Sequence, residues 1–395
     1  MPKPPALIRA ITDPVDVGFA GERPWDLQVH NPAIYGDLLR RGSLALGEAY
    51  VRGDWDCEAL DQLFTRLLGS PGSRQVSGGF LPHAQLLSAL RCQAEHWMNW
   101  QTRQRSTRVA RQHYDIDHRV YAATLDSRLI YSCAHWQHAD DLETAQLHKL
   151  QRICQKLELS PGMRLLDVGC GWGALAAFAA ATYGVEVVGI TLSQKQADFC
   201  RTHFGDQFDV VLCDYRSEQL REMGSFDRIV SIGMLEHVGR KNDRRYFETL
   251  SRLLNLDGLI LIQTIGSHDT NDALDPWIDT YIFPGGRLPS AQQLSTGFED
   301  RFLLQDWENF GFDYDRTLMA WWQNFEQSWP ALQAQLQPSF DRFWRYYLLC
   351  CAGFFRSGQG QLWQLVLSPK ASPRSYRSSR PRLCELGDPV AAVAL

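Results

Sequence analysis

The residues best suited to chemistry form a glycine-rich turn, DVGCGWG, at 167–173. The turn follows the apolar run 164–168 and precedes a helix-like segment at 174–182. Glycines at the end of a strand let the backbone approach a ligand closely, because they carry no Cβ. A tight turn alone is the alternative, but the strand, turn and helix together predict a nucleoside site. The GxGxG spacing, with no acid at the end of the next strand, argues against a dinucleotide.

Short apolar runs alternate with helical segments around this turn. Ser193 follows the second run and is expected to cap the next helix, and a charged helical stretch is expected at 240–256. The expected strands are 164–168, 185–190, 209–213, 227–232 and 259–264, with 303–307 and 362–367 as candidates to complete the sheet. This alternation predicts a doubly wound α/β fold with a parallel sheet over 160–265.

Composition narrows the class of protein. The chain has 395 residues, 45% of them hydrophobic, which is enough for a large core. Its net charge of −5 argues against a nucleic-acid partner. No apolar run approaches the roughly 20 residues that a membrane span needs, and no signal peptide is evident, so we expect a cytoplasmic protein. The sequence contains neither CxxC nor HExxH, so no metal site is expected.

Several stretches outside the turn follow a more specific pattern. They are 29–32, 42–44, 47–50, 53–55, 131–134 (YSCA), 166–173 (LDVGCGWG), 189–196 (GITLSQKQ), 231–239 (SIGMLEHVG), 275–286 (DPWIDTYIFPGG) and 312–322 (FDYDRTLMAWW). The glycine turn looks like the first motif of S-adenosylmethionine (SAM)-dependent methyltransferases. All the stretches together resemble cyclopropane-fatty-acyl-phospholipid synthases over roughly 25–370. Related mycolic-acid cyclopropane synthases lack the N-terminal part, which favours the phospholipid branch.

The resemblance implies a fold and a domain organisation. We expect an α/β protein with the Rossmann-like sheet of class I SAM methyltransferases, helical insertions and a smaller, mainly helical N-terminal domain. The expected divisions are an N-terminal domain for lipid engagement and dimerisation at 1–100, a basic linker at 101–111, a catalytic domain at 112–370 and a basic flexible tail at 371–395. Within the N-terminal domain, 61–68 and 86–90 have amphipathic helical spacing.

The same resemblance implies which residues bind SAM. Tyr131 and Ser132 are expected to contact it from a preceding helix. Gly169 and Gly171 are expected to leave room for its methionine portion. The residues expected around the ribose and the adenine are Thr191, Leu192, Gln196, Asp214, Tyr215 and Arg216.

Cyclopropane formation sets physical demands on the site. The methyl group of SAM is electrophilic, but an isolated alkene is a poor nucleophile, and its attack leaves a carbocation on the chain. Water must be excluded, the cation stabilised and a proton removed from the transferred methyl group. Aromatic side chains are concentrated between Trp307 and Trp363, and Tyr314, Trp321 and Trp322 are expected to line the acyl chain and face the cation.

For the base, the resemblance implies a bound bicarbonate rather than a side chain. Its expected ligands are the backbone near Cys133, the carboxylate of Glu236, residue 263, the backbone at Ile265 and the hydroxyl of Tyr314. We expect Glu236 to accept the bicarbonate hydroxyl, because a carboxylate beside an anion is repulsive unless the two share a proton. The family's histidine is replaced here by Gln263, which can donate an N–H but cannot titrate near neutral pH.

Three functions follow from these observations. The leading hypothesis is transfer of a methylene group from SAM to the cis double bond of an unsaturated phospholipid acyl chain. The second is methylation that gives a methyl- or methylene-branched lipid, because Gln263 alters the cage. The third is a non-catalytic protein that binds lipid or SAM. We further expect a homodimer associated peripherally with the inner face of the membrane, with four arginines as its contact, Arg103, Arg105, Arg108 and Arg111.

Overall fold

The computed structural model describes residues 3–70, 117–270, 274–373 and 375–378. These residues form two compact units. The first takes its residues from 1–100, 273–287 and 314–361, and the second takes them from 101–272, 288–313 and 362–395. Each unit is therefore assembled from segments that lie far apart in the sequence.

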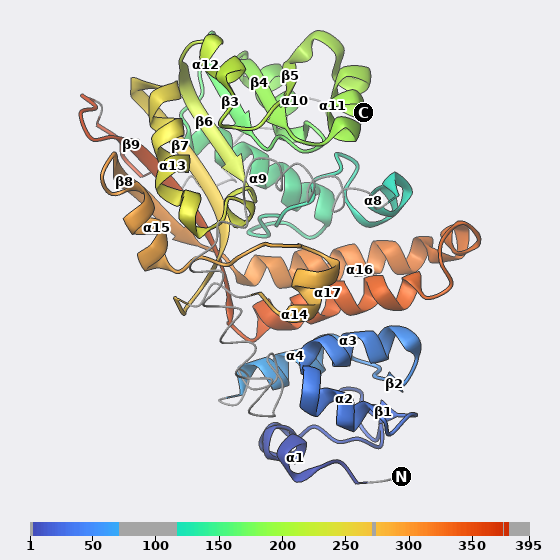
Figure 1. Ribbon diagram of the computed structural model, residues 1–395. Helices are drawn as coiled ribbons and strands as arrows, with labels where there is room; N and C mark the ends of the chain where they lie inside the picture. The colour runs from blue at the N-terminus through green and yellow to red at the C-terminus, as the bar shows by residue number, and fades with distance from the viewer. Residues whose placement is uncertain (1–2, 71–116, 271–273, 374, 379–395) are drawn as a thin grey trace. The chain divides into compact units, whose positions relative to one another are not determined.

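In its described residues, the second unit contains a seven-stranded sheet with the order β5-β4-β3-β6-β7-β9-β8 (Figure 1). Its strands are β3 (Arg164–Val168), β4 (Glu186–Thr191), β5 (Asp209–Leu212), β6 (Phe226–Ile232), β7 (Leu254–Ser267), β8 (Phe302–Asn309) and β9 (Gly360–Pro369). The pairs from β5 through β7 are parallel, whereas β8 and β9 are antiparallel. The carboxyl ends of five parallel strands therefore share one edge, where α/β sheets bind their ligands.

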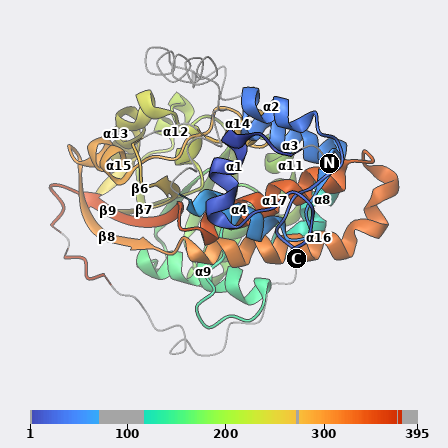
Figure 2. The ribbon, with the colours of Figure 1, turned by 90° about the horizontal axis from the view of Figure 1, so that it is seen from below.

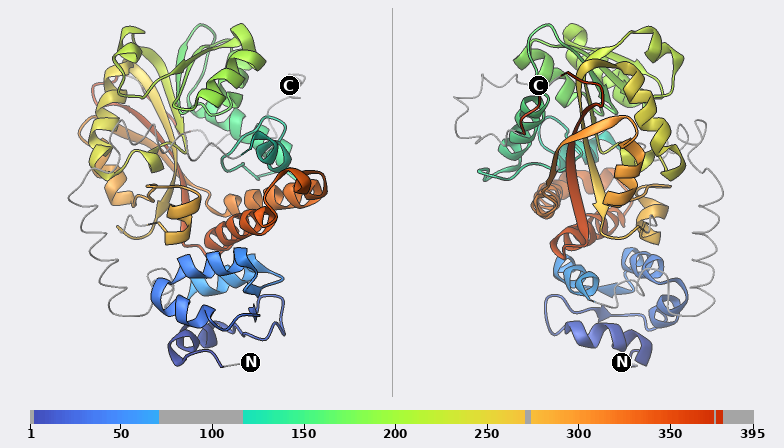
Figure 3. Two further views of the ribbon diagram at one scale, coloured as in Figure 1. Left: turned by 45° about the vertical axis from the view of Figure 1, so that its right-hand side comes forward. Right: turned by 90° about the vertical axis from the view of Figure 1, so that its left-hand side faces the viewer.

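Helices cover both faces of this sheet (Figures 2 and 3). On one face pack α9 (Leu142–Lys156), α10 (Ala174–Tyr183) and α11 (Gln194–Phe204), and on the other α12 (Glu218–Glu222), α13 (Asp243–Leu253) and α15 (Ala291–Phe298). Successive β7 side chains enter opposite cores, since Leu259 and Leu261 face α9 and α10 while Ile260 and Ile262 face α13. Burial on both faces explains why these strands are apolar without alternation.

The sequence predicted the strands correctly, including the last two, and the helix cap at Ser193. The Ser193 hydroxyl accepts a hydrogen bond from the Gln196 N–H at 3.3 Å. The predicted helical stretch at 240–256 is wrong at its end, because α13 stops at Leu253 and β7 begins at Leu254. Leu254 pairs with Phe226, and a shift in register after that pair accommodates the residues between Leu254 and Leu259. Tertiary pairing therefore overrides the local helical pattern there.

The first unit is mainly helical. Its helices are α1 (Ala6–Thr12), α2 (Ile34–Arg41), α3 (Ser43–Arg52), α4 (Leu60–Gly69), α14 (Pro276–Tyr281), most of α16 (Phe312–Leu332) and α17 (Phe340–Arg356). The predicted amphipathic run 61–68 is confirmed as α4. Tyr346 of α17 is buried and contacts three other helices, with ring-centroid distances of 5.6 Å to Tyr50, 5.4 Å to Phe64 and 4.6 Å to Trp277. Aromatic packing of this kind holds the segments of the unit together.

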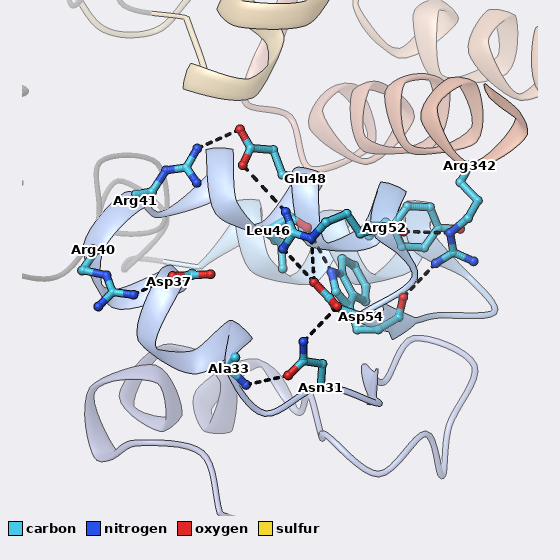
Figure 4. Close-up of polar contacts among 12 residues, drawn as sticks. Asn31, Ala33, Asp37, Arg40, Arg41, Leu46, Glu48, Arg52, Asp54 and Arg342 are labelled. Carbon is cyan, nitrogen blue, oxygen red and sulfur yellow. Dashed lines mark hydrogen bonds and ion pairs between the residues drawn. The ribbon is translucent and has the colours of Figure 1, made fainter. Parts of the chain in front are cut away.

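Arginines and acids fix the ends of the helices in the first unit (Figure 4). Arg342 of α17 donates to the carbonyl of Tyr50, in the last turn of α3, at 2.7 Å and to that of Trp55 at 2.9 Å. Asp54 accepts from Asn31 at 3.0 Å and from Arg52 at 2.7 Å. These bonds tie the end of α3 and the segment that follows it to α17 and to Asn31.

Within the described residues, none of the helices combines the length and the apolarity needed to cross a bilayer. The predicted linker 101–111 and the amphipathic run 86–90 lie outside the described residues, as do residues 379–395 of the predicted tail. The domain boundaries predicted from the sequence stay predictions.

The packing of α17 on α4 generates a testable prediction. A Cβ on Gly353 would lie 2.5 Å from the Cβ of Phe64 and 2.7 Å from the carbonyl oxygen of Asp61. We expect Gly353→Ala to lower the free energy of unfolding by about 1–3 kcal/mol, because the overlap falls on backbone and Cβ atoms. The matched control is Gly36→Ala in α2, where the nearest atom lies at 3.8 Å, and it should stabilise slightly. Urea unfolding of both variants tests this, and equal stabilities would contradict it.

Candidate active site

The glycine turn lies at the carboxyl end of β3 and is attached to β4, because the Gly169 N–H donates to the carbonyl of Ile190 at 2.9 Å. Gly169, Gly171 and Gly173 have φ values of 87°, 57° and 87°. A Cβ on Gly173 would come within 2.9 Å of α11 side chains, so packing requires glycine there. A Cβ on Gly171 meets none of the described atoms within 4 Å. Gly171 therefore borders open space that a ligand can fill.

The residues predicted at the ribose side form a small buried network. The Thr191 hydroxyl donates to Oε1 of Gln196 at 2.8 Å and accepts from the Ser193 N–H at 3.1 Å. Thr191 and Gln196 are buried, whereas Leu192 is partly exposed. The structure thus brings Thr191 and Gln196 together at the end of β4, and their contact with a ribose stays a prediction.

The residues predicted at the adenine side follow β5. The Arg216 side chain binds the carboxylate of Asp214 through two hydrogen bonds, both of 2.7 Å, so the two charges compensate each other. Tyr215 is buried with its ring 5.0 Å from the ring of Tyr246, and its hydroxyl has no hydrogen-bond partner among the described residues. Burial raises the pKa of Tyr215 to about 12. The hydroxyl therefore stays neutral near pH 7.

Tyr131 and Ser132 lie in a loop, not on the helix that the sequence predicted. The loop 126–134 follows α8 (His118–Thr124) and contains Leu129 at φ 57°. A backbone turn bond and a side chain hold it, since the Leu129 N–H donates to the Asp126 carbonyl at 2.9 Å and the Ile130 N–H donates to the carboxylate of Asp126 at 2.8 Å. The ring of Tyr131 lies 5.2 Å from that of Tyr121 on α8.

Two side chains of α9 form hydrogen bonds with the 126–134 loop. Gln146 donates to the Ser132 carbonyl at 2.9 Å, and the buried Lys149 donates to the Ser132 hydroxyl at 2.8 Å. Burial lowers the pKa of Lys149 to about 8 and raises that of Asp126 to about 6. Neither of these α9 residues was predicted from the sequence. Polar residues on the buried side of a helix were the available signal.

Asp167 was also missed as a functional candidate, although it belongs to the predicted glycine motif. It is the one acid in β3, immediately before Val168 and the turn, and it is only 2% exposed. Burial raises the pKa of its carboxyl to about 7. A buried acid at the ligand-binding edge of the sheet is a typical feature of functional sites.

Glu236 and Ile265 lie together at the ends of β6 and β7. The backbone pairing of the two strands continues past Ile232, since the Gly233 N–H donates to the Gln263 carbonyl at 2.9 Å. Farther along β7, the Ile265 N–H donates instead to the carboxylate of Glu236 at 2.7 Å. Glu236 is on a short 3₁₀ turn, Leu235–His237, and is 8% exposed. The backbone of β7 therefore fixes the orientation of this acid.

The other predicted cage residues fall in both units. Cys133 is buried in the second unit, with its Sγ 3.2 Å from the Ala134 carbonyl. Gln263 is 1% exposed, and its side-chain carbonyl accepts a hydrogen bond from Gln364. Tyr314 belongs to the first unit, where its ring stacks on Phe355 at 4.5 Å. Its place relative to Glu236 stays a prediction.

Comparison with known proteins identifies the family. A family model described as mycolic acid cyclopropane synthetase matches residues 101–365. The chain belongs to this family. It is also 43% identical to the cyclopropane-fatty-acyl-phospholipid synthase of Escherichia coli K12, over 89% of this chain and 90% of the relative. A tuberculostearic acid methyltransferase of Mycobacterium tuberculosis, UfaA1, is 30% identical over 92% of this chain and 87% of its own.

Members of the family with solved structures agree with the fold. The cyclopropane synthase MmaA2 of Mycobacterium tuberculosis has a TM-score of 0.61 and 34% identity, covering 67% of this chain and 98% of its own. The mycolic acid cyclopropane synthase CmaA1, solved with S-adenosylhomocysteine (SAH), has a TM-score of 0.60 and 31% identity. The match covers 67% of this chain and 98% of CmaA1. The predicted class I methyltransferase fold is confirmed, and the protein is a SAM-dependent methyltransferase.

The open space beside Gly171 gives a prediction about SAM binding. We expect Gly171→Ala to weaken SAM affinity at least ten-fold, because the new methyl group projects into that space. The stability loss should be about 1–2 kcal/mol, the usual cost of a positive φ in a residue with a Cβ. Calorimetric titration with SAM and urea unfolding measure the two effects. Unchanged affinity would show that the space does not receive the cofactor.

The buried Asp167 gives a prediction about pH. The pKa of its carboxyl is about 7 in the folded protein against an ordinary 3.8, so the folded state binds this proton more tightly than the unfolded state does. The free energy of unfolding is therefore highest below about pH 4. It falls as the pH rises to about 7, by on the order of 4 kcal/mol. Asp167→Asn should remove this decline in urea unfolding, whereas the exposed control Asp209→Asn should keep it. A decline that persists in Asp167→Asn would assign it elsewhere.

Proposed function

We propose that the protein transfers a methylene group from SAM to the cis double bond of an unsaturated phospholipid acyl chain and so forms a cyclopropane ring. The similarity to the Escherichia coli phospholipid synthase carries this proposal, because it extends over 89% of the chain and includes segments of both units. The cyclopropane mycolic acid synthase MmaA2 aligns with only 65% of this chain. The first unit is thus part of the similarity to a phospholipid enzyme and not an unrelated addition.

The residues around the glycine turn fit SAM. Gly171 borders open space, Tyr215 holds a buried hydroxyl without a hydrogen-bond partner in the described residues, and Thr191 and Gln196 form a polar pair at the end of β4. SAM supplies an electrophilic methyl group on a sulfonium. The glycine turn and the 126–134 loop would orient it, with Tyr131 and Ser132 contributed by the loop that α9 holds in place.

The base in this proposal is a bicarbonate ion, and the residues at the end of β7 fit it. Ile265 holds the carboxylate of Glu236 in one orientation through its N–H, so Glu236 is ready to accept a hydroxyl proton. Gln263 lies two residues earlier on β7 and offers an amide. The backbone near Cys133 and the hydroxyl of Tyr314 complete the proposed cage. The role of the protein is to hold the anion and to exclude water from it.

We also propose peripheral association with the inner face of the membrane, as a homodimer in the cytoplasm. A protein whose substrate is a phospholipid acyl chain must reach the bilayer surface, since none of its described helices crosses it. The arginines at 103, 105, 108 and 111, predicted as the contact, lie outside the described residues.

The decisive experiment is an assay of the purified protein with SAM and vesicles of cis-monounsaturated phospholipid. We expect SAH and a lipid product heavier by one CH₂ that resists mild hydrogenation. The isosteric variant Glu236→Gln should reduce turnover by about 10²–10³-fold, because it cannot take up a proton. It should still bind SAM and fold, since its side-chain carbonyl can accept the Ile265 N–H in the same way.

The alternatives give different results in this assay. A methylene-branched product, or a methyl-branched alkene formed by loss of a different proton, has the same mass as the cyclopropane but is reduced by mild hydrogenation. Either would replace ring formation with methylation as the activity. Absence of SAH formation would leave a binding protein. Full activity of Glu236→Gln would exclude this acid from the proton transfer.

A further inference from the structure

Gln364 lies beside the proposed anion site but is absent from the set of residues predicted for it. It is on β9, between β7 and β8, and its side chain is completely buried. Its Nε2 donates to Oε1 of Gln263 at 2.9 Å. This is the one hydrogen bond that the Gln263 side chain makes in the part of the chain that the structure describes. The amide nitrogen of Gln263 is therefore not used in this pair.

A glutamine can present either of two opposite groups to a ligand. Its amide nitrogen donates, which suits an anion, whereas its carbonyl oxygen has lone pairs that repel one. The end that faces the ligand is decided by the partner that engages the other end. In Gln263 the carbonyl is occupied by Gln364, so the nitrogen is the end left for bicarbonate.

We infer that Gln364 is a positioning residue, which engages the carbonyl of Gln263 and thereby turns its amide nitrogen toward the anion. This inference rests on the proposed function, because it assumes bicarbonate as the base. It also explains how a chain with glutamine in place of the family's histidine still offers an N–H donor.

The reverse arrangement of the pair is less favourable. Either orientation leaves one amide nitrogen and one carbonyl of the two glutamines without a hydrogen-bond partner among the described residues. In the structure, the unpaired group that is fully buried is the Gln364 carbonyl, and the unpaired Gln263 nitrogen is not among the fully buried atoms. The reverse orientation would place an N–H donor at the fully buried position, where unpaired donors are rarer in proteins than underused carbonyls.

The backbone of Gln364 is held in place by the sheet. It is paired in register with Glu308 on β8, and Glu308 binds Lys156 of α9 at 2.7 Å and also Arg152. Burial opposes ionisation of Glu308, but the hydrogen bond from Arg152 and the charge of Lys156 outweigh it and lower its pKa to about 2. Glu308, Gln364 and Gln263 therefore form a polar row across three strands, anchored by two cations.

The test compares Gln364→Met with the control Gln305→Met. Methionine keeps the length and volume of glutamine without its donor. Gln305 donates to Ser368 at 2.7 Å across the same β8–β9 pair and is not in the row. In buffer freed of carbon dioxide, we measure the rate of methylene transfer and the melting temperature of the substrate-free protein at increasing bicarbonate.

For Gln364→Met we expect about a ten-fold rise in the bicarbonate concentration needed for half-maximal rate and for half-maximal thermal stabilisation. The KM for SAM should not change, and saturating bicarbonate should restore the rate. Gln305→Met should match the parent. Gln263→Met should show the same defect, and the double variant should be no worse than either single one. If Gln364→Met does not fold, Gln364→Asn keeps the polar group but shortens its reach and gives the same test.

Three results would overturn the inference. They are parental bicarbonate dependence in Gln364→Met, equal defects in Gln364→Met and Gln305→Met, and additive defects in the double variant. A parent protein that neither needs bicarbonate nor is stabilised by it would overturn the proposed base as well. The product assay with phospholipid vesicles reports separately on ring formation, so the two failures are distinguishable.

Discussion

The hydrogen bond from the Ile265 N–H to the carboxylate of Glu236 is the interaction on which the proposed chemistry depends. β6 ends at Ile232, whereas β7 continues to Ser267, so the last part of β7 lacks a neighbouring strand on that side. A buried backbone donor needs an acceptor, and the carboxylate of Glu236 supplies it at 2.7 Å. The sheet itself therefore orients the acid, and no second charged side chain is needed for the purpose.

The strand order explains why the cofactor residues and Glu236 lie at one edge. The order of the sheet reverses between β3 and β6, and ligands in open α/β sheets bind at this switch point, outside the carboxyl ends of the strands. The glycine turn follows β3, and the turn that carries Glu236 follows β6. Two loops with different chemistry thus begin from adjacent, parallel-paired strands. One provides space for a cofactor, and the other provides a fixed proton acceptor.

The sequence predicted the strands well because burial on both faces produces short apolar runs that few other structures share. It also predicted the glycine turn, although it could not separate Gly173, which packing requires, from Gly171, which borders open space. Contacts between distant segments were less accessible. The start of β7 at Leu254 depends on pairing with Phe226, and the loop around Ser132 depends on Lys149 of α9.

The role of Gln364 was hidden for a related reason. A glutamine in an apolar strand is visible in the sequence, but its partner lies 101 positions away. Local patterns report the periodicity of an element and the residues at its ends. They do not report which side chain satisfies a buried polar group on another strand. The polar row from Glu308 to Gln263 therefore emerges only from the register of β8 and β9.

The composition of the first unit has a consequence for biosynthesis. α3 and α4 come early in the chain, but Tyr346, which packs on Tyr50 and Phe64, comes from α17 near its end. While the ribosome is still making the central part of the polypeptide, the faces of α3 and α4 that pack on Tyr346 lack that partner. The packing of the first unit can therefore be completed only after translation has passed α17, and apolar surface exposed until then favours aggregation.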